Sequence, residues 1–194
     1  DIALLICKLW ILLIEWVEYV PECMELHMKD GRKAKIIIES STILNKDEDG
    51  INYRIINDSM IIDRNNNILL ANHTQNNRYT LYYGILGIAP YVYANRVIKD
   101  IKFSNTIRDI YIYAFKDSIL PKKVVLPDSV KNIYDEAFDV KSKTEFIIPE
   151  GIEGIGQNVF SAGSVVKFRG PKPQWFEENT QPEGVTFVYN YKGD

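Results

Sequence analysis

One phrase recurs four times in this chain and constrains its fold more than any other feature. Each copy has an apolar residue, an Ile three positions later, and a Val or Ala followed by an aromatic residue four positions after that. The four aromatic residues are Tyr93, Phe115, Phe138 and Phe160, and they lie 22, 23 and 22 positions apart. A repeat of this length cannot bury its apolar face alone, so neighbouring copies must stack. The sequence therefore predicts a solenoid.

A short alternating run precedes each copy of the phrase, at residues 79–81, 101–103, 124–126 and 146–148. Alternation among β-branched and aromatic residues predicts short strands with every second side chain facing inward. Pro127 and Pro149 follow two of these strands, where a missing N–H is tolerated. The apolar spacing then widens, which predicts a bend and a short helical turn. We expect a mainly β fold with short helical turns.

The segment 1–20 is strongly apolar, but Lys8, Glu15 and Glu18 interrupt it. A membrane-spanning helix needs about 20 mostly apolar residues, so we expect no transmembrane span. The segment also lacks the basic start and cleavage site of a signal peptide. Its charges fall near one stripe at helical spacing, which predicts an apolar helix ending at Pro21. Such a helix could pack on the end of the solenoid or dock on a partner or membrane surface.

The remaining segments complete the expected organisation. Residues 24–38 predict a hairpin turning at 29–31, and the run 34–39 predicts the first strand of the solenoid. Turn residues between short apolar runs predict a hairpin insertion at 51–78. We thus expect an N-terminal helix and hairpin over 1–33, acting as a cap or docking element. A solenoid over 34–194 follows, with a C-terminal cap over 165–194 in which Trp175 and Phe176 cover the open end.

The phrases VVLPDSVKNIYDEAF and FIIPEGIEGIGQNVF resemble the BspA-like leucine-rich repeat family. The resemblance covers about residues 34–190. It is specific for Ala114-Phe115, for Ile133 with Ala137-Phe138, and for Ile155-Gly156 with Phe160. It implies a right-handed leucine-rich-repeat solenoid of about 22–23 residues per coil. Family members resemble adhesins and partner-binding proteins, so the resemblance favours the cell surface or secretion, although fold alone does not give function.

Signals for chemistry are few. The formal net charge of −3 and a pI near 5.5 argue against nucleic-acid binding. The two histidines, His27 and His73, lie in segments of different expected structure, and no nucleophile-elbow, phosphate-loop or zinc-helix motif occurs. Cys7 and Cys23 do not form a disulfide framework. Residues 45–56 resemble a calcium loop, but Ile56 stands where a bidentate Glu is needed, so an acidic surface turn is favoured and no metal or cofactor is predicted.

The solenoid's outward residues are therefore the candidate binding site. Alternation predicts a row of outward strand positions: Thr80, Lys102, Val125, Ile147 and Lys167. The bend positions predict a second row: Leu86, Arg108, Lys131 and Glu153. Val125 and Ile147 would form an apolar centre with a charged rim, a composition typical of a binding patch. The alternative is that another part of the chain covers them.

Three functions follow from these expectations. The first is a non-catalytic module that binds a protein or glycan through the ladder of repeats. The second is a structural subunit that docks into a larger assembly through the N-terminal helix. The third, an enzyme with an unrecognised site, has no motif behind it.

Overall fold

The computed structural model describes residues 14–20, 23–28, 33–37, 45–46, 52–56 and 59–193. Contacts between residues divide the chain into two compact units, Asp1–His73 and Thr74–Asp194. Residues 34–73, which were expected to belong to the solenoid, thus group with the N-terminal unit.

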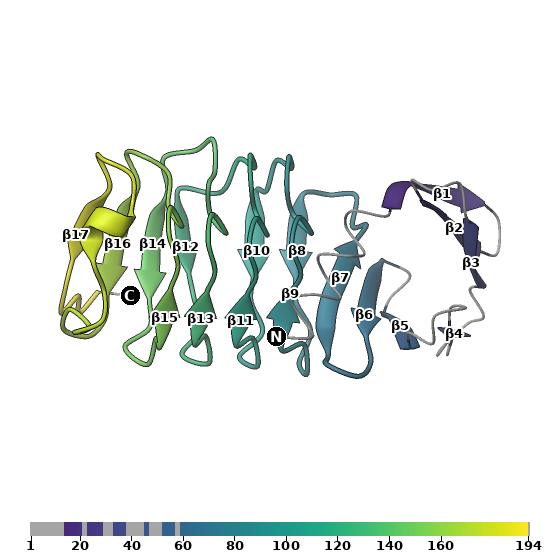
Figure 1. The fold of residues 1–194 in the computed structure, drawn as a ribbon, viewed down its shortest axis with the longest axis horizontal. Coiled ribbons are helices and arrows are strands. Elements are labelled where there is room, and N and C mark those ends of the chain that lie inside the picture. The colour runs from purple at the N-terminus through teal and green to yellow at the C-terminus, as the bar shows by residue number, and fades with distance from the viewer. Residues whose placement is uncertain are drawn as a thin grey trace. The chain divides into compact units, whose positions relative to one another are not determined.

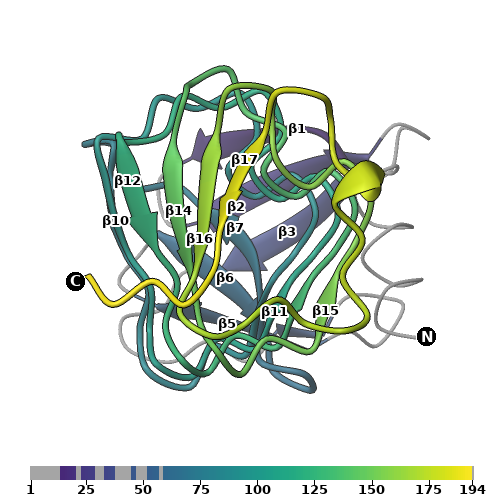
Figure 2. The same cartoon turned by 90° about the vertical axis from the view of Figure 1, so that its left-hand side faces the viewer.

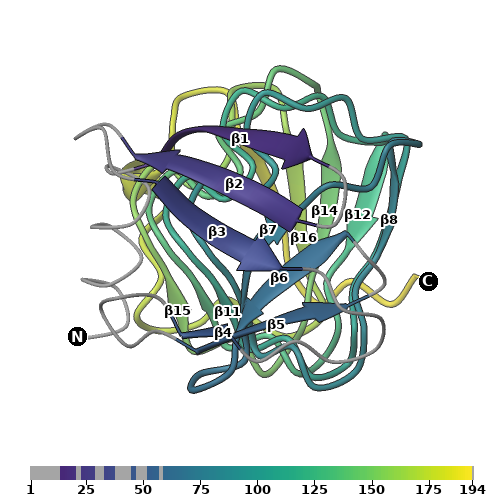
Figure 3. The ribbon, with the colours of Figure 1, turned by 90° about the vertical axis from the view of Figure 1, so that its right-hand side faces the viewer.

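The first unit contains a three-stranded antiparallel sheet (Figure 3), made of β1 (Ile14–Val20), β2 (Cys23–Met28) and β3 (Lys33–Ile37). The expected N-terminal helix is wrong over residues 14–20, and residues 1–13 lie outside the described residues. The segment Ile14–Val20 is rich in β-branched and aromatic residues, which favour a strand. Pairing with β2 then satisfies the backbone groups along one edge of this strand, with Val17 opposite Leu26.

The hairpin predicted over 24–38 is confirmed in its two strands, because β2 and β3 pair antiparallel. Cys23 lies opposite Ile37 and Leu26 opposite Ala34. The predicted turn at 29–31 lies outside the described residues. β3 is therefore not the first strand of a parallel solenoid, as the run 34–39 had suggested.

A second antiparallel group in this unit contains β4 (Asn45–Lys46), β5 (Asn52–Ile56), β6 (Met60–Asp63) and β7 (Ile68–Asn72). The turn between β6 and β7 is held by the Asp63 carboxylate, which accepts from the Asn65 backbone N–H at 2.9 Å. It also accepts from the Asn66 amide at 2.9 Å. Asn67 closes the turn with φ of 54°, a conformation that Asn tolerates well. Antiparallel hairpins therefore join β5 to β6 and β6 to β7, within the range 51–78.

The second unit is a parallel β-solenoid (Figure 1). One set of strands contains β8 (Arg78–Thr80), β10 (Asp100–Lys102), β12 (Lys123–Val125), β14 (Glu145–Ile148), β16 (Val165–Phe168) and β17 (Thr186–Val188). A second set contains β9 (Gly87–Ile88), β11 (Asp109–Ile110), β13 (Asn132–Ile133) and β15 (Gly154–Ile155). Equivalent residues pair in register from coil to coil, as Ile88, Ile110, Ile133 and Ile155 do. The predicted solenoid and its period are confirmed.

The aromatic residues of the repeated phrase form a column inside this unit. Tyr93, Phe115, Phe138 and Phe160 have no exposed surface. Ring centroids are 5.0 Å apart for the first pair and 4.9 Å for the second, with nearly parallel planes. The last pair opens to 6.4 Å, and the Phe146 ring lies 4.9 Å from Phe138 and 5.1 Å from Phe160. The column therefore supplies the core that the repeat predicted.

The short helical turns expected in the second half of each repeat are not formed. Tight turns replace them, and each turn has at least one residue in the left-handed region: Tyr91, Tyr113, Glu136 and Asn158, with φ between 50° and 62°. A positive φ interrupts a helix, because consecutive residues must share negative φ values. Among the described residues the only helical element is η1 (Glu178–Thr180), a single 3-10 turn. None of the described helical structure is long and apolar enough to cross a membrane.

The C-terminal end of the solenoid is closed by an aromatic residue and an amide. Phe176 is buried and lies 5.3 Å from Phe168 and 5.4 Å from Phe187, measured between ring centroids. Trp175 remains 43% exposed, so of the expected aromatic pair only Phe176 is buried. The buried Gln181 side chain completes the closure by bonding to backbone groups of the last coil.

Candidate functional site

The residues of the predicted outward row lie side by side in two separate groups, one on β8 and β10 and the other on β12, β14 and β16. Thr80 pairs with Lys102 across β8 and β10, and Val125 pairs with Ile147 across β12 and β14. Lys167 on β16 continues the second part next to Ile147. Parallel pairing without a register shift places equivalent side chains side by side on one face. The predicted alignment within each part is confirmed.

The exposure of this row is uneven. Thr80 and Lys102 are exposed, and Val125 is 41% exposed. Ile147, however, has no exposed surface, so the prediction that it faces solvent is wrong. We refer to the outward residues Thr80, Lys102 and Val125 as the strand face.

The C-terminal segment lies against the same set of strands near Ile147. The Tyr191 N–H donates to the Phe168 carbonyl of β16 at 2.9 Å. The Nζ of Lys167 lies 4.6 Å from the centre of the Tyr191 ring and 2.7 Å from the Glu145 carboxylate. That hydrogen bond and charge pair raise the pKa of Lys167. In Figure 2 this segment leaves β17 and runs along the side on which β14 and β16 lie. This end of the row is thus covered by the chain itself.

The second predicted row is also in register. The N–H groups of Arg108, Lys131 and Glu153 each donate to the carbonyl of the equivalent residue one coil earlier, at 2.7–2.8 Å. Lys131 pairs with Glu153 at 3.0 Å and donates to the Gly151 carbonyl at 2.9 Å. Its charge is therefore already satisfied by partners on the next coil. Leu86 and Arg108 are the exposed members at the other end of the row.

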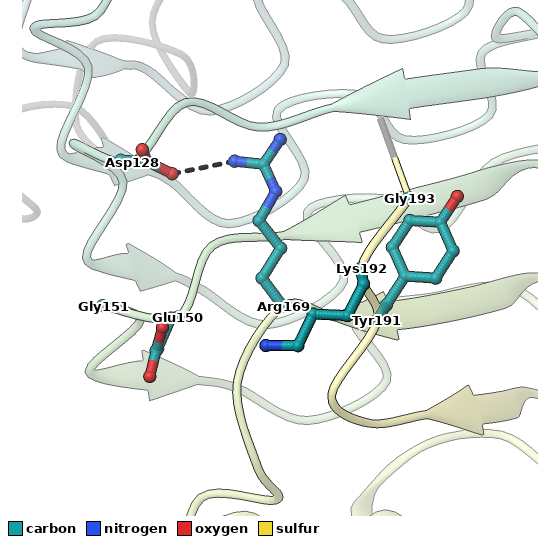
Figure 4. Close-up of a pocket in the computed structure, with 7 residues that line it drawn as sticks. All are labelled: Asp128, Glu150, Gly151, Arg169, Tyr191, Lys192 and Gly193. Atoms are coloured by element: carbon teal, nitrogen blue, oxygen red, sulfur yellow. Dashed lines mark hydrogen bonds and ion pairs between the residues drawn. The ribbon is translucent and has the colours of Figure 1, made fainter.

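A polar hollow near the C-terminal end was not predicted (Figure 4). Its volume is about 460 Å³, and its lining is Asp128, Glu150, Gly151, Arg169, Tyr191, Lys192 and Gly193. Arg169 Nη1 lies 2.9 Å from Asp128 Oδ1 and so joins two coils that are not neighbours. One feature of the sequence distinguishes this region, because Arg169 occupies the position that holds Pro127 and Pro149 in the preceding coils. The C-terminal segment's contribution had no sequence signal.

A tyrosine cluster occupies the turns that follow β9, β11 and β13. The rings of Tyr91 and Tyr113 stack with centroids 5.1 Å apart, and Lys116 Nζ lies 4.4 Å from the Tyr113 ring centre. Lys116 also pairs with Glu136 at 2.6 Å, and this hydrogen bond raises the pKa of Lys116. Burial and the neighbouring Tyr113 raise the pKa of Tyr91. Lys116 also lies 3.7 Å from the Asp139 carboxylate, so its positive charge is satisfied within the cluster.

The calcium-like segment 45–56 is described only at its ends. Asn45–Lys46 pairs antiparallel with Asn52–Ile56, and the residues between them lie outside the described range. Within the described part of the chain, no group of three or more His, Cys, Asp or Glu side chains is arranged to hold a metal ion.

These features define a class: a parallel β-solenoid built from 22- and 23-residue coils around an Ile and Ala-Phe core. The chain belongs to the BspA type leucine-rich repeat family, since six copies of the BspA type leucine rich repeat region match residues 71–175. The suspected resemblance is confirmed. Neither the curated proteins nor the solved structures contain a match to this chain.

Proposed function

We propose that this protein is a non-catalytic scaffold that binds a protein partner through the strand face. The family is a repeat scaffold of a kind that generally mediates protein interactions. The proposal rests on the exposure of Val125, an apolar residue that is 41% exposed on β12, the edge strand of its four-stranded sheet. An exposed apolar side chain bordered by charged ones has the composition of an interface centre with a polar rim.

Binding of a protein is favoured over binding of a glycan by the chemistry of this face. Glycan sites need exposed aromatic rings or paired polar groups, whereas Val125 is aliphatic and Lys102 has no ionic partner among the described residues. An adhesin-like role at the cell surface is the setting that the family favours. The alternative of an assembly subunit depended on an N-terminal helix and is not carried further, because residues 14–20 form a strand.

A photo-crosslinking residue placed at position 125 tests the proposal. Val125 pairs laterally with β14 but is exposed, so the substitution leaves the core intact. We expect a discrete protein adduct from cells that make the protein, and weaker binding of the purified partner to Val125→Asp by calorimetry.

Leu86→Asp is the matched control, because Leu86 is 36% exposed and lies on the bend row. Equal loss of binding in both variants would contradict a role for the strand face. Binding to a glycan array that Val125→Asp removes, without any protein adduct, would favour the glycan alternative.

A further inference from the structure

A second surface borders the segments that lead into β10, β12 and β14. These segments lie beside one another along the upper edge of the solenoid in Figure 1. Val97 and Ile119 form a parallel bridge there, and their side chains are 48% and 46% exposed. Two β-branched residues held side by side present a small continuous apolar strip.

Lys141 extends this strip onto the next coil. The Lys141 N–H donates to the Ser118 carbonyl at 2.8 Å, just as the Ile119 N–H donates to the Arg96 carbonyl at 2.8 Å. The same offset in both bonds places Lys141 beside Ile119 in the row. Its ammonium group lies 3.4 Å from Asp117, in an exposed pair that competes weakly with other anions.

Unpaired cations lie next to the strip. Lys99 follows Val97 by two residues and Lys122 follows Ile119 by three, on neighbouring coils. Both are exposed, and neither has a carboxylate within ion-pair distance among the described residues. We call Val97, Ile119, Lys99, Lys122 and Lys141 the basic edge. It is locally positive on a chain whose formal net charge is −3.

We propose that the basic edge binds an acidic peptide segment of a partner protein, in which carboxylates flank aliphatic side chains. The two exposed aliphatic residues would cover the partner's apolar side chains, while Lys99 and Lys122 would pair with its carboxylates. A polysulfated glycan would use the lysines without using Val97 and Ile119. An anionic membrane needs a larger apolar surface to insert than two side chains provide. This edge is distinct from the strand face, so the inference does not depend on Val125.

The test uses a fluorescent peptide in which glutamates alternate with leucine and valine, titrated with the whole chain and followed by anisotropy. We expect binding that weakens as salt is raised. Reversing two charges with Lys99→Glu and Lys122→Glu together should weaken binding about tenfold, because each exposed pair becomes a repulsion. Val97→Asp with Ile119→Asp should weaken it comparably.

Lys192→Glu is the matched control, because Lys192 is also exposed and unpaired among the described residues but lines the hollow instead. A peptide with lysine in place of glutamate should not bind. Equal binding by the lysine-reversed variant, or by the Lys192→Glu and edge variants alike, would overturn the proposal. So would binding to heparin or to phosphatidylserine vesicles without binding to the acidic peptide. Val125→Asp should leave peptide binding unchanged, which separates this proposal from the strand-face function.

Discussion

Gln181 is expected to carry much of the stability of the last coil, and replacing it tests how the solenoid is closed. In each internal coil the N–H of the column aromatic residue donates to a backbone carbonyl of the next coil, as Phe138 does to Val159 at 2.9 Å. In the last coil the column aromatic residue is Phe160, and its N–H donates to the Gln181 side-chain oxygen at 3.4 Å. The same oxygen accepts from the N–H of Val159 at 2.8 Å, while the Gln181 amide donates to the Gly156 carbonyl at 2.7 Å. The side chain thus imitates the peptide group of one further coil.

The variant Gln181→Ala removes these three bonds and leaves the N–H groups of Val159 and Phe160 without this acceptor. A buried unsatisfied polar group costs about 1–3 kcal/mol, so we expect the last coil to lose about 2 kcal/mol. That loss corresponds to a roughly thirtyfold increase in the opening equilibrium constant. Repeat proteins need not unfold in one step, so a global unfolding midpoint would understate the effect. Amide hydrogen exchange at Val159 and Phe160 measures it directly.

Two variants serve as controls for this experiment. Gln174→Ala changes an exposed glutamine before the closing turn, and exchange at Val159 should be unaffected. Gln181→Glu keeps the acceptor for Val159 but places a carboxylate against the Gly156 carbonyl, so protection should fall to an intermediate level. If exchange at Val159 in Gln181→Ala matches that of the unaltered protein, the amide is not what closes the coil.

Three further variants test the buried aromatic column, the close packing of Gly156 against Asp135, and the pKa of Glu178. Phe138→Ala should destabilise the solenoid by about 3–5 kcal/mol, measured by urea unfolding, because it removes a fully buried ring from the middle of the column. Gly156→Ala should also lower the unfolding midpoint, because an added Cβ would lie 2.6 Å from the Asp135 backbone nitrogen; an unchanged midpoint would mean that the turn relaxes freely. The hydrogen bond from Tyr189, at 2.7 Å, lowers the pKa of Glu178 below its ordinary 4.5, so this stabilisation is present above pH 4.5 and is lost as the pH falls through the folded-state pKa. Tyr189→Phe should move the Glu178 pKa, followed by NMR titration, back towards 4.5, and no movement would contradict the assigned cause.

For the outward row, the sequence predicted which residues lie side by side but not which of them are exposed. Alternation placed Val125 and Ile147 side by side, and the register confirms it. Alternation cannot report what lies over a face, so the burial of Ile147 could not be read from β14 alone. Contacts of Tyr191 with β16, far along the chain, lie against this end of the face. The hollow lined by Arg169 was missed for the same reason.

What the sequence determined by itself is the repeating core. The Ile and Ala-Phe positions recur at a period that only stacked coils can bury, so family, strand order and aromatic column follow from local pattern. The tertiary structure decided three further features: the strand at residues 14–20, the coverage of Ile147, and the closure by Gln181. Each depends on which distant segment supplies a hydrogen-bond partner or removes water from a side chain. That information lies in contacts between residues far apart in the chain, and no local periodicity contains it.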